Sequence, residues 1–116
     1  MPKSVEDLDV FKLSHELVVR AYTLSRNFPK EETYSLTSQL RRAASSVPAN
    51  LVEGANRNSR ADYRRFVSIA KGSAAETKYH LLLAKDLGYI EDKEYQPVAL
   101  DYARVLGMLD KLVKAL

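Results

Sequence analysis

Apolar side chains recur with a helical period along nearly the whole chain, and this pattern constrains the fold more than any other feature. Four segments carry it, at residues 9–27, 33–57, 59–87 and 92–115. No segment alternates apolar and polar side chains as a strand would. Because the connections are short, consecutive helices are expected to run antiparallel. The sequence predicts an all-α fold, an antiparallel up-down-up-down four-helix bundle in a single domain, residues 1–116.

A proline interrupts the second of these segments. Pro48 lacks an amide hydrogen and its ring crowds the carbonyl of Ala44, which predicts a kink in the second helix. In the alternative, Ser46 caps a new helical segment with Pro48 in its first turn, where proline is tolerated. The sequence leaves both arrangements open.

Composition excludes several classes of protein. Apolar residues make up 46% of the 116 residues and charged residues 28%, which is typical of a globular chain. The absence of cysteine excludes disulfides and thiolate metal sites. No apolar run approaches the roughly 18 residues of a membrane span, and the first residues lack a signal peptide's apolar region. We therefore expect a soluble, cytoplasmic protein with no membrane partner.

The positive charge is concentrated in the middle of the chain. Residues 36–80 hold eight cations and three acids, whereas residues 1–35 and 81–116 each hold five cations and six acids. On a helical projection, four cations of the third segment fall within about 40° of one another and form a stripe beside its apolar face. Evenly spaced cations on a rigid helix can follow a phosphate backbone. The predicted nucleic-acid contacts are these four residues and three that widen the stripe: Arg60, Arg64, Lys71, Lys78, Arg41, Arg57 and Arg65.

Two plainer interpretations of these cations remain open. They form a solvated surface, or they pair with acids of a neighbouring subunit. The chain contains no RNA-binding aromatic motif, so we expect any nucleic-acid binding to depend on shape and charge rather than on base sequence.

A group of polar side chains lies beside the core face of the second and third helices. Its members are predicted to be structural hydrogen-bonding residues, with catalysis as the alternative: Gln39, Arg42, Asn50, Glu53 and Glu76. Gly54 projects into the core, where glycine costs about 1 kcal/mol relative to alanine, so we expect another backbone to approach closely there. Gly72 suggests the same for the third helix.

Two helices carry more apolar surface than one bundle core needs. The additional side chains predict a homo-oligomer interface formed by Ile69, Leu83, Leu87, Phe11, Val18 and Tyr22. The alternative is a broad core face with a few exposed apolar residues.

Enzymatic and cofactor signatures are absent from the sequence. Glu76 and His80 are one residue too far apart for the Glu-x-x-His motif of di-iron bundles, and both histidines, His15 and His80, are expected at the surface or in an interface. Ser68 and Lys71 match a serine–lysine pattern without the structural context that it requires. We expect no enzyme activity, no metal, no cofactor and no small-molecule substrate.

Residues 39–84 resemble the signature of the bacterial 23S rRNA-intervening sequence protein family. The resemblance rests on the stretch QLRRA, on Asn50, Glu53-Gly54, Arg57, Ser59, Phe66 and Ala70, on Gly72-Ser73-x-x-Glu76, and on the opening FKLSHELVVRAY. It implies a four-helix bundle assembled into a ring-shaped homopentamer. It also extends to the accessory proteins of diversity-generating retroelements, which bind nucleic acid and assist a reverse transcriptase.

Two functional hypotheses follow. In the first, the protein is a non-enzymatic, oligomeric accessory protein that binds the backbone of RNA or DNA, with a reverse transcriptase as a candidate partner. In the second, it is a protein–protein interaction scaffold with no nucleic-acid role, and its arginines mainly build the interface.

Overall fold

The computed structural model describes residues 4–116, and all of the regular structure in this range is helical. The elements are two 3-10 helices and four α-helices: η1 (Val5–Asp7), α1 (Asp9–Ser25), η2 (Lys30–Glu32), α2 (Leu36–Ala55), α3 (Arg60–Asp86) and α4 (Asp92–Ala115). No strand occurs in the described range, so the predicted all-α class with four helices is confirmed. Residues 1–3 of the predicted domain lie outside the described residues.

Local signals explain where the helices begin and end. Residues 30–32 form η2, so α2 begins at Leu36 rather than near Thr33. The Ser59 hydroxyl accepts a hydrogen bond from the Asp62 amide (3.1 Å) and thereby caps the start of α3. Gly88, with φ of +81°, follows the end of α3 in the left-handed conformation that glycine adopts without strain.

The second helix is continuous through its buried proline. Because α2 extends unbroken from Leu36 to Ala55, the alternative in which Ser46 caps a separate segment is wrong. The Ser45 hydroxyl donates to the carbonyls of Arg41 (2.9 Å) and Arg42 (3.2 Å), one turn before the proline. A kink at Pro48 remains a prediction.

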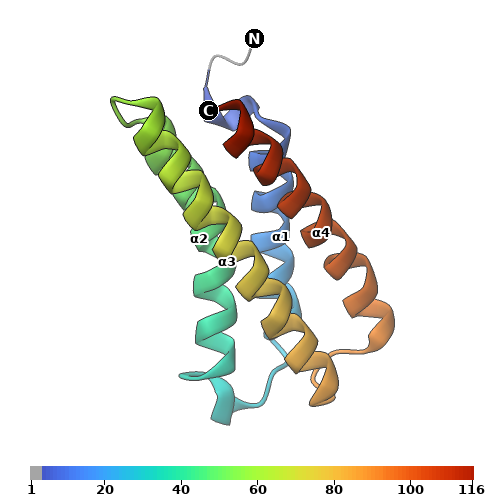
Figure 1. Ribbon diagram of the computed structural model, residues 1–116. Coiled ribbons are helices and arrows are strands. Elements are labelled where there is room, and N and C mark those ends of the chain that lie inside the picture. The colour runs from blue at the N-terminus through green and yellow to red at the C-terminus, as the bar shows by residue number, and fades with distance from the viewer. Residues whose placement is uncertain (1–3) are drawn as a thin grey trace.

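Each helix packs against two others, in the order α1, α2, α3, α4 and back to α1. α2 and α3 lie side by side and share the most extensive contact among the described elements (Figure 1). The turn between α2 and α3 and the C-terminal end of α4 lie at the same end of the molecule (Figure 1). Over residues 4–116, none of the helices combines the length and apolar character that a membrane span requires.

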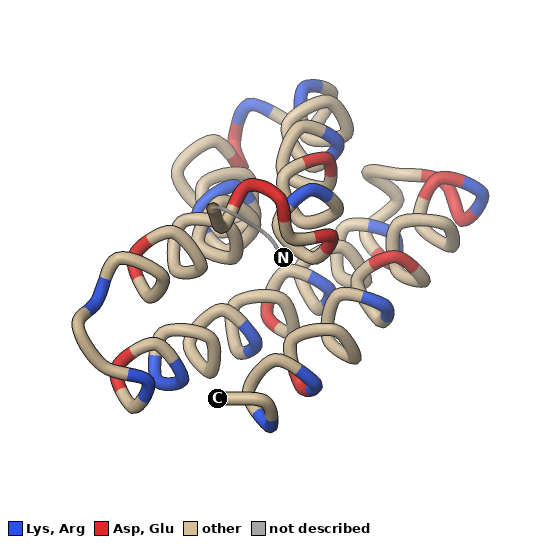
Figure 2. The backbone as a smooth tube through the Cα atoms, turned by 90° about the horizontal axis from the view of Figure 1, so that it is seen from above, with Lys and Arg blue, Asp and Glu red and all other residues tan. Residues whose placement is uncertain are grey.

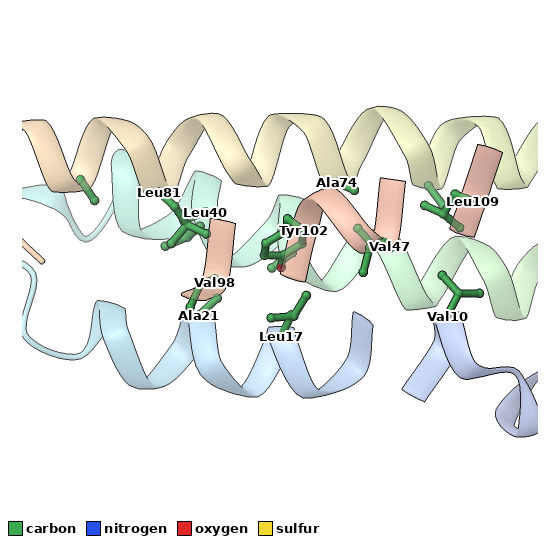
Figure 3. Packing of buried hydrophobic residues seen from close by; sticks show 14 of the residues in the cluster. Val10, Leu17, Ala21, Leu40, Val47, Ala74, Leu81, Val98, Tyr102 and Leu109 are labelled. Carbon is green, nitrogen blue, oxygen red and sulfur yellow. The ribbon is translucent and has the colours of Figure 1, made fainter. Parts of the chain in front are cut away.

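The core is built from apolar side chains of all four helices. Tyr102 of α4 is fully buried and lies between Leu17 of α1, Val47 of α2 and Ala74 of α3 (Figure 3). Burial raises the pKa of its phenol well above the ordinary value, and the Thr77 hydroxyl lowers it by less. Most of the apolar residues that recur with a helical period along the sequence are likewise buried in this core.

Gly54 permits the closest approach between α2 and α3. A Cβ atom at this position would lie 2.8 Å from the Phe66 Cβ and 3.2 Å from the Tyr63 carbonyl oxygen, both on α3. The first distance is too short for two carbon atoms and the second is tighter than an ordinary contact, so the expected close approach at Gly54 is confirmed. The same expectation for Gly72 is wrong within one chain, since Gly72 is exposed and a Cβ there would meet no atom within 4 Å.

Replacing Gly54 should therefore test the packing of α2 against α3. Gly54→Ala forces Phe66 and the Tyr63 backbone to move, and we expect it to reduce the free energy of unfolding by about 1–3 kcal/mol, as overpacked core substitutions do. Chemical denaturation followed by circular dichroism measures this change. In the control Gly107→Ala, the added methyl group meets nothing within 4 Å on α4, so we expect a gain of about 0.5–1 kcal/mol. A Gly54→Ala protein as stable as the control would contradict this account of the packing.

Candidate nucleic-acid interface

Cationic residues gather at the turn between α2 and α3 and along the start of α3 (Figure 2). From residue 57 to residue 71 the chain holds five cations and one acid. The helical fold explains the gathering, because the turn brings the last residues of α2 next to the first turns of α3. This end of the molecule belongs to residues 36–80, the part of the sequence in which the positive charge is concentrated.

An aromatic ring holds two of these arginines in place. Gly54 leaves room for Phe66, and the guanidinium carbons of Arg57 and Arg65 lie 4.7 and 4.5 Å from the centre of its ring. Cation–π contacts of this kind fix a guanidinium without removing its charge. Each of the two arginines also has an acidic neighbour: Arg57 Nη2 lies 2.7 Å from Glu53 Oε1, and Arg65 Nε lies 3.7 Å from Asp62 Oδ1.

The predicted stripe on α3 is interrupted at its centre. Lys71 Nζ lies 3.0 Å from Asp110 Oδ1 on α4, and Lys114 contacts the same carboxylate at 2.9 Å. Lys114 and Lys71 together lower the pKa of Asp110. In contrast, Arg60, Arg64 and Lys78 form no ion pair with any residue that the structure describes.

The remaining predicted contacts lie apart from the α2–α3 turn. Lys78 is half-buried between α3 and α4, beside Leu82 and Tyr95, about 27 Å along the helix from Arg60. Arg41 faces α1, where its Nε donates to the Ser25 hydroxyl (2.9 Å) and its guanidinium lies 4.6 Å from the centre of the Tyr22 ring. The sequence had suggested that Arg41 widens the α3 stripe. Its contacts with α1 show that it does not.

Most of the predicted polar cluster stays together, because Ser46, the hydrogen-bond partner of Asn50, lines the same depression as the other members. Gln39, Arg42 and Glu76 line an open depression of about 300 Å³ between α2 and α3. Asn50 donates to the backbone and to the side chain of Ser46 (both 2.8 Å), and the Ser46 hydroxyl lies 2.8 Å from that of Ser73 on α3. These hydroxyls join the two helices.

Glu53 lies away from the rest of the cluster. Its side chain is 54% exposed and pairs with Arg57 on the same helix. This contact is a surface ion pair, so the interpretation of Glu53 as part of a packed polar cluster is wrong for a single chain.

One of the histidines expected at the surface or in an interface, His80, is buried within its own chain, and its place in an interface remains a prediction. His80 is 7% exposed rather than on the surface, and its Nε2 lies 3.4 Å from Glu76 Oε2 without forming a hydrogen bond. It lines a depression of about 310 Å³ together with Tyr79, Leu83 and Leu87. Within residues 4–116, no three His, Asp or Glu side chains come close enough together to hold a metal ion.

The predicted oligomer-interface residues fall into two groups. Ile69, Leu87 and Tyr22 are 41%, 50% and 41% exposed, as an unpartnered apolar surface requires. Phe11, Val18 and Leu83 are half-buried and pack against the core of their own chain. Other exposed apolar residues were not predicted from the sequence, because they lie in a turn or beside the apolar faces of the helices: Tyr34, Leu100, Tyr79, Val19 and Val52.

Comparison with known proteins identifies relatives of this chain. The family model described as 23S rRNA-intervening sequence protein matches residues 6–111. The chain is also similar to a solved structure from Bacteroides thetaiotaomicron, described as a protein of unknown function from the S23 ribosomal protein family, with 29% identity and a TM-score of 0.81. The similarity covers 90% of this chain and 98% of that chain. A comparison with curated proteins gives no match.

The geometry of the polar cluster predicts different costs for two of its residues. Glu53→Gln removes an exposed ion pair, so the free energy of unfolding should change by less than about 1 kcal/mol. Ser46→Ala removes one of the two acceptors of Asn50 and the contact with Ser73, both half-buried, and should cost about 1–2 kcal/mol. Denaturant unfolding of both variants under the same conditions gives the two values. A larger loss for Glu53→Gln than for Ser46→Ala would contradict this assignment.

Proposed function

The chain belongs to the 23S rRNA-intervening sequence protein family, and from this membership we propose that it is a non-enzymatic, oligomeric accessory protein that binds the backbone of RNA or DNA. The observation that carries the proposal is the pair of cations at the start of α3. Arg60 and Arg64 are exposed and form no ion pair within residues 4–116. One turn of helix separates them, a spacing at which both can contact phosphates of one strand.

The stacked arginines support the same proposal. Phe66 orients Arg57 and Arg65 beside the unpaired cations, which lowers the entropy lost when their guanidinium groups bind phosphate. Their partners Glu53 and Asp62 are exposed carboxylates, and exposed ion pairs are weak enough for a phosphate to compete. Binding of this kind recognises shape and charge rather than base sequence.

Assembly is the second part of the proposal. Each chain forms an antiparallel up-down-up-down bundle, and the chains form a ring-shaped homopentamer through the exposed side chains of Ile69 and Leu87. A ring repeats the cationic end of α3 in every subunit and so multiplies the phosphate contacts. The proposed partners are RNA or DNA, together with a reverse transcriptase that the protein assists.

A protein-interaction scaffold is the alternative function, and one observation favours it. Tyr79 is 57% exposed and Leu87 is 50% exposed, and both line the depression that contains His80. Apolar side chains grouped in this way are typical of protein–protein contact sites. In this alternative the arginines pair with acids of another protein chain.

Reversing the two unpaired cations separates these functions. We expect Arg60→Glu/Arg64→Glu to weaken binding to RNA and DNA and to reduce the slope of log affinity against log salt by about two, one for each lost phosphate contact. Fluorescence anisotropy at several salt concentrations measures both quantities. The matched control Lys12→Glu/Arg20→Glu makes the same charge change at two exposed positions on α1. If the two double variants bind equally well, the α3 site is not the interface. If the wild-type protein shows little nucleic-acid binding at physiological salt and the double variant at α3 no longer assembles, the scaffold function is correct.

Assembly has its own test. The wild-type chain should sediment as an oligomer at micromolar concentration, and Leu87→Glu should dissociate it because a charge replaces an exposed apolar side chain. Leu87 lies outside the core, so the helical content of the variant should be retained. A wild-type protein that sediments as a single 13.1 kDa species would contradict the proposed assembly.

A further inference from the structure

A groove between α1 and the start of α2 combines aromatic, cationic and hydroxyl side chains. It has a volume of about 330 Å³ and lies where α1, the segment before α2 and the first turns of α2 meet. Two tyrosines, two arginines and four serine or threonine residues line it, and none of the lining residues is acidic. Its volume is at the lower end of the range of about 300–1,000 Å³ that is typical of small-ligand pockets. We propose that this groove binds one nucleotide of a single-stranded nucleic acid, with the base against Tyr34 and the phosphate at Arg41.

Tyr34 is the most exposed aromatic side chain that the structure describes. It is 97% exposed at the rim of the groove, directly before α2. An aromatic side chain so fully in water contributes little to the stability of its own chain, because it buries almost no apolar area. An exposed ring at the rim of a basic groove offers a face on which an unpaired base can stack, as aromatic side chains of single-strand binding proteins do.

Arg41 is oriented for an anion at the same groove. Its Nε donates to Ser25 (2.9 Å), and its guanidinium is stacked over the Tyr22 ring (4.6 Å). Both contacts hold the side chain in one position, while its two terminal nitrogens make no hydrogen bond or ion pair with residues 4–116. A guanidinium fixed on one edge and free on the other is suited to two parallel hydrogen bonds with a phosphate.

The neighbouring residues keep the groove positively charged. Arg42 also lines it and forms no ion pair with the described residues. The nearby acid Glu32 is directed elsewhere: its Oε2 accepts a hydrogen bond from the Tyr89 hydroxyl (2.7 Å), a contact that raises the pKa of Tyr89. The side chains of Thr33, Thr37 and Ser38 add hydroxyl groups that can bind sugar or phosphate oxygens.

Stacking on Tyr34 requires an unpaired base. Bases in a duplex are stacked on one another and do not present a free face, whereas bases of a single strand do. The inference rests on the proposed function and specifies which nucleic acid each site binds. The α3 site accepts any phosphate backbone, and the Tyr34 groove favours single strands.

The test compares single-stranded and duplex oligonucleotides of about 12 nucleotides, a length within the range of single-strand sites, each in RNA and in DNA. We expect Tyr34→Ala to weaken single-strand binding about tenfold or more and to leave duplex binding unchanged. Tyr34→Phe keeps the stacking face and should bind as the wild type does. Tyr79→Ala removes another exposed tyrosine, on α3 and outside this groove, and should change neither affinity. Arg41→Ala should reduce the single-strand salt slope by about 0.7.

Three outcomes would overturn the inference. If Tyr34→Ala binds single strands normally while Arg60→Glu/Arg64→Glu does not, the Tyr34 groove is not a nucleotide site and the proposed function stands. If wild-type protein shows no salt-dependent binding to any of the four oligonucleotides, the proposed function fails and this inference fails with it. If Tyr34→Ala changes the oligomeric state measured by sedimentation, the groove is a contact between copies of the chain.

Discussion

Contact between α2 and α3 at Gly54 is the constraint on which the rest of the structure depends. Without a side chain at that position, the Phe66 Cβ and the Tyr63 backbone approach α2 so closely that a Cβ atom there would force them to move. Because this contact lies one residue before the end of α2, it fixes how the chain reverses into α3. The hydroxyls of Ser46 and Ser73 join the same two helices two turns earlier, so the pair is held by packing at one point and by hydrogen bonding at another.

The cationic end of the bundle follows from that packing. Gly54 positions Phe66, and the Phe66 ring positions Arg57 and Arg65. Their weak surface ion pairs leave the region positive, and Arg60 and Arg64 add charge that no described acid offsets. Farther along α3, Lys71 pairs with Asp110, and Lys78 is unpaired but half-buried. Charge available to a partner is therefore concentrated at one end of α3 instead of along its whole length.

Periodicity along the sequence was enough to predict the helices and most of the core, because each apolar stripe belongs to one helix. It was also enough for Gly54, which interrupts a stripe in the middle of a helix. Gly72 has a similar sequence context but lies on the exposed side of α3. The contact of Lys71 with Asp110 joins residues 39 positions apart, and no pattern within one helix predicts it. Tyr34 falls inside the predicted segment 33–57, but α2 begins only at Leu36, so the exposure of Tyr34 became apparent only in the folded chain.

Hydrogen–deuterium exchange of the wild-type protein, with and without a saturating single-stranded oligonucleotide, tests the central claim most directly. The claim is that nucleic acid binds where Gly54 and Phe66 place the cations. We predict slower exchange in peptides that cover the α2–α3 turn and the first two turns of α3, at low salt and not at high salt, since phosphate contacts are screened. Unchanged exchange across residues 56–67, together with slower exchange elsewhere in the bundle, would contradict the account.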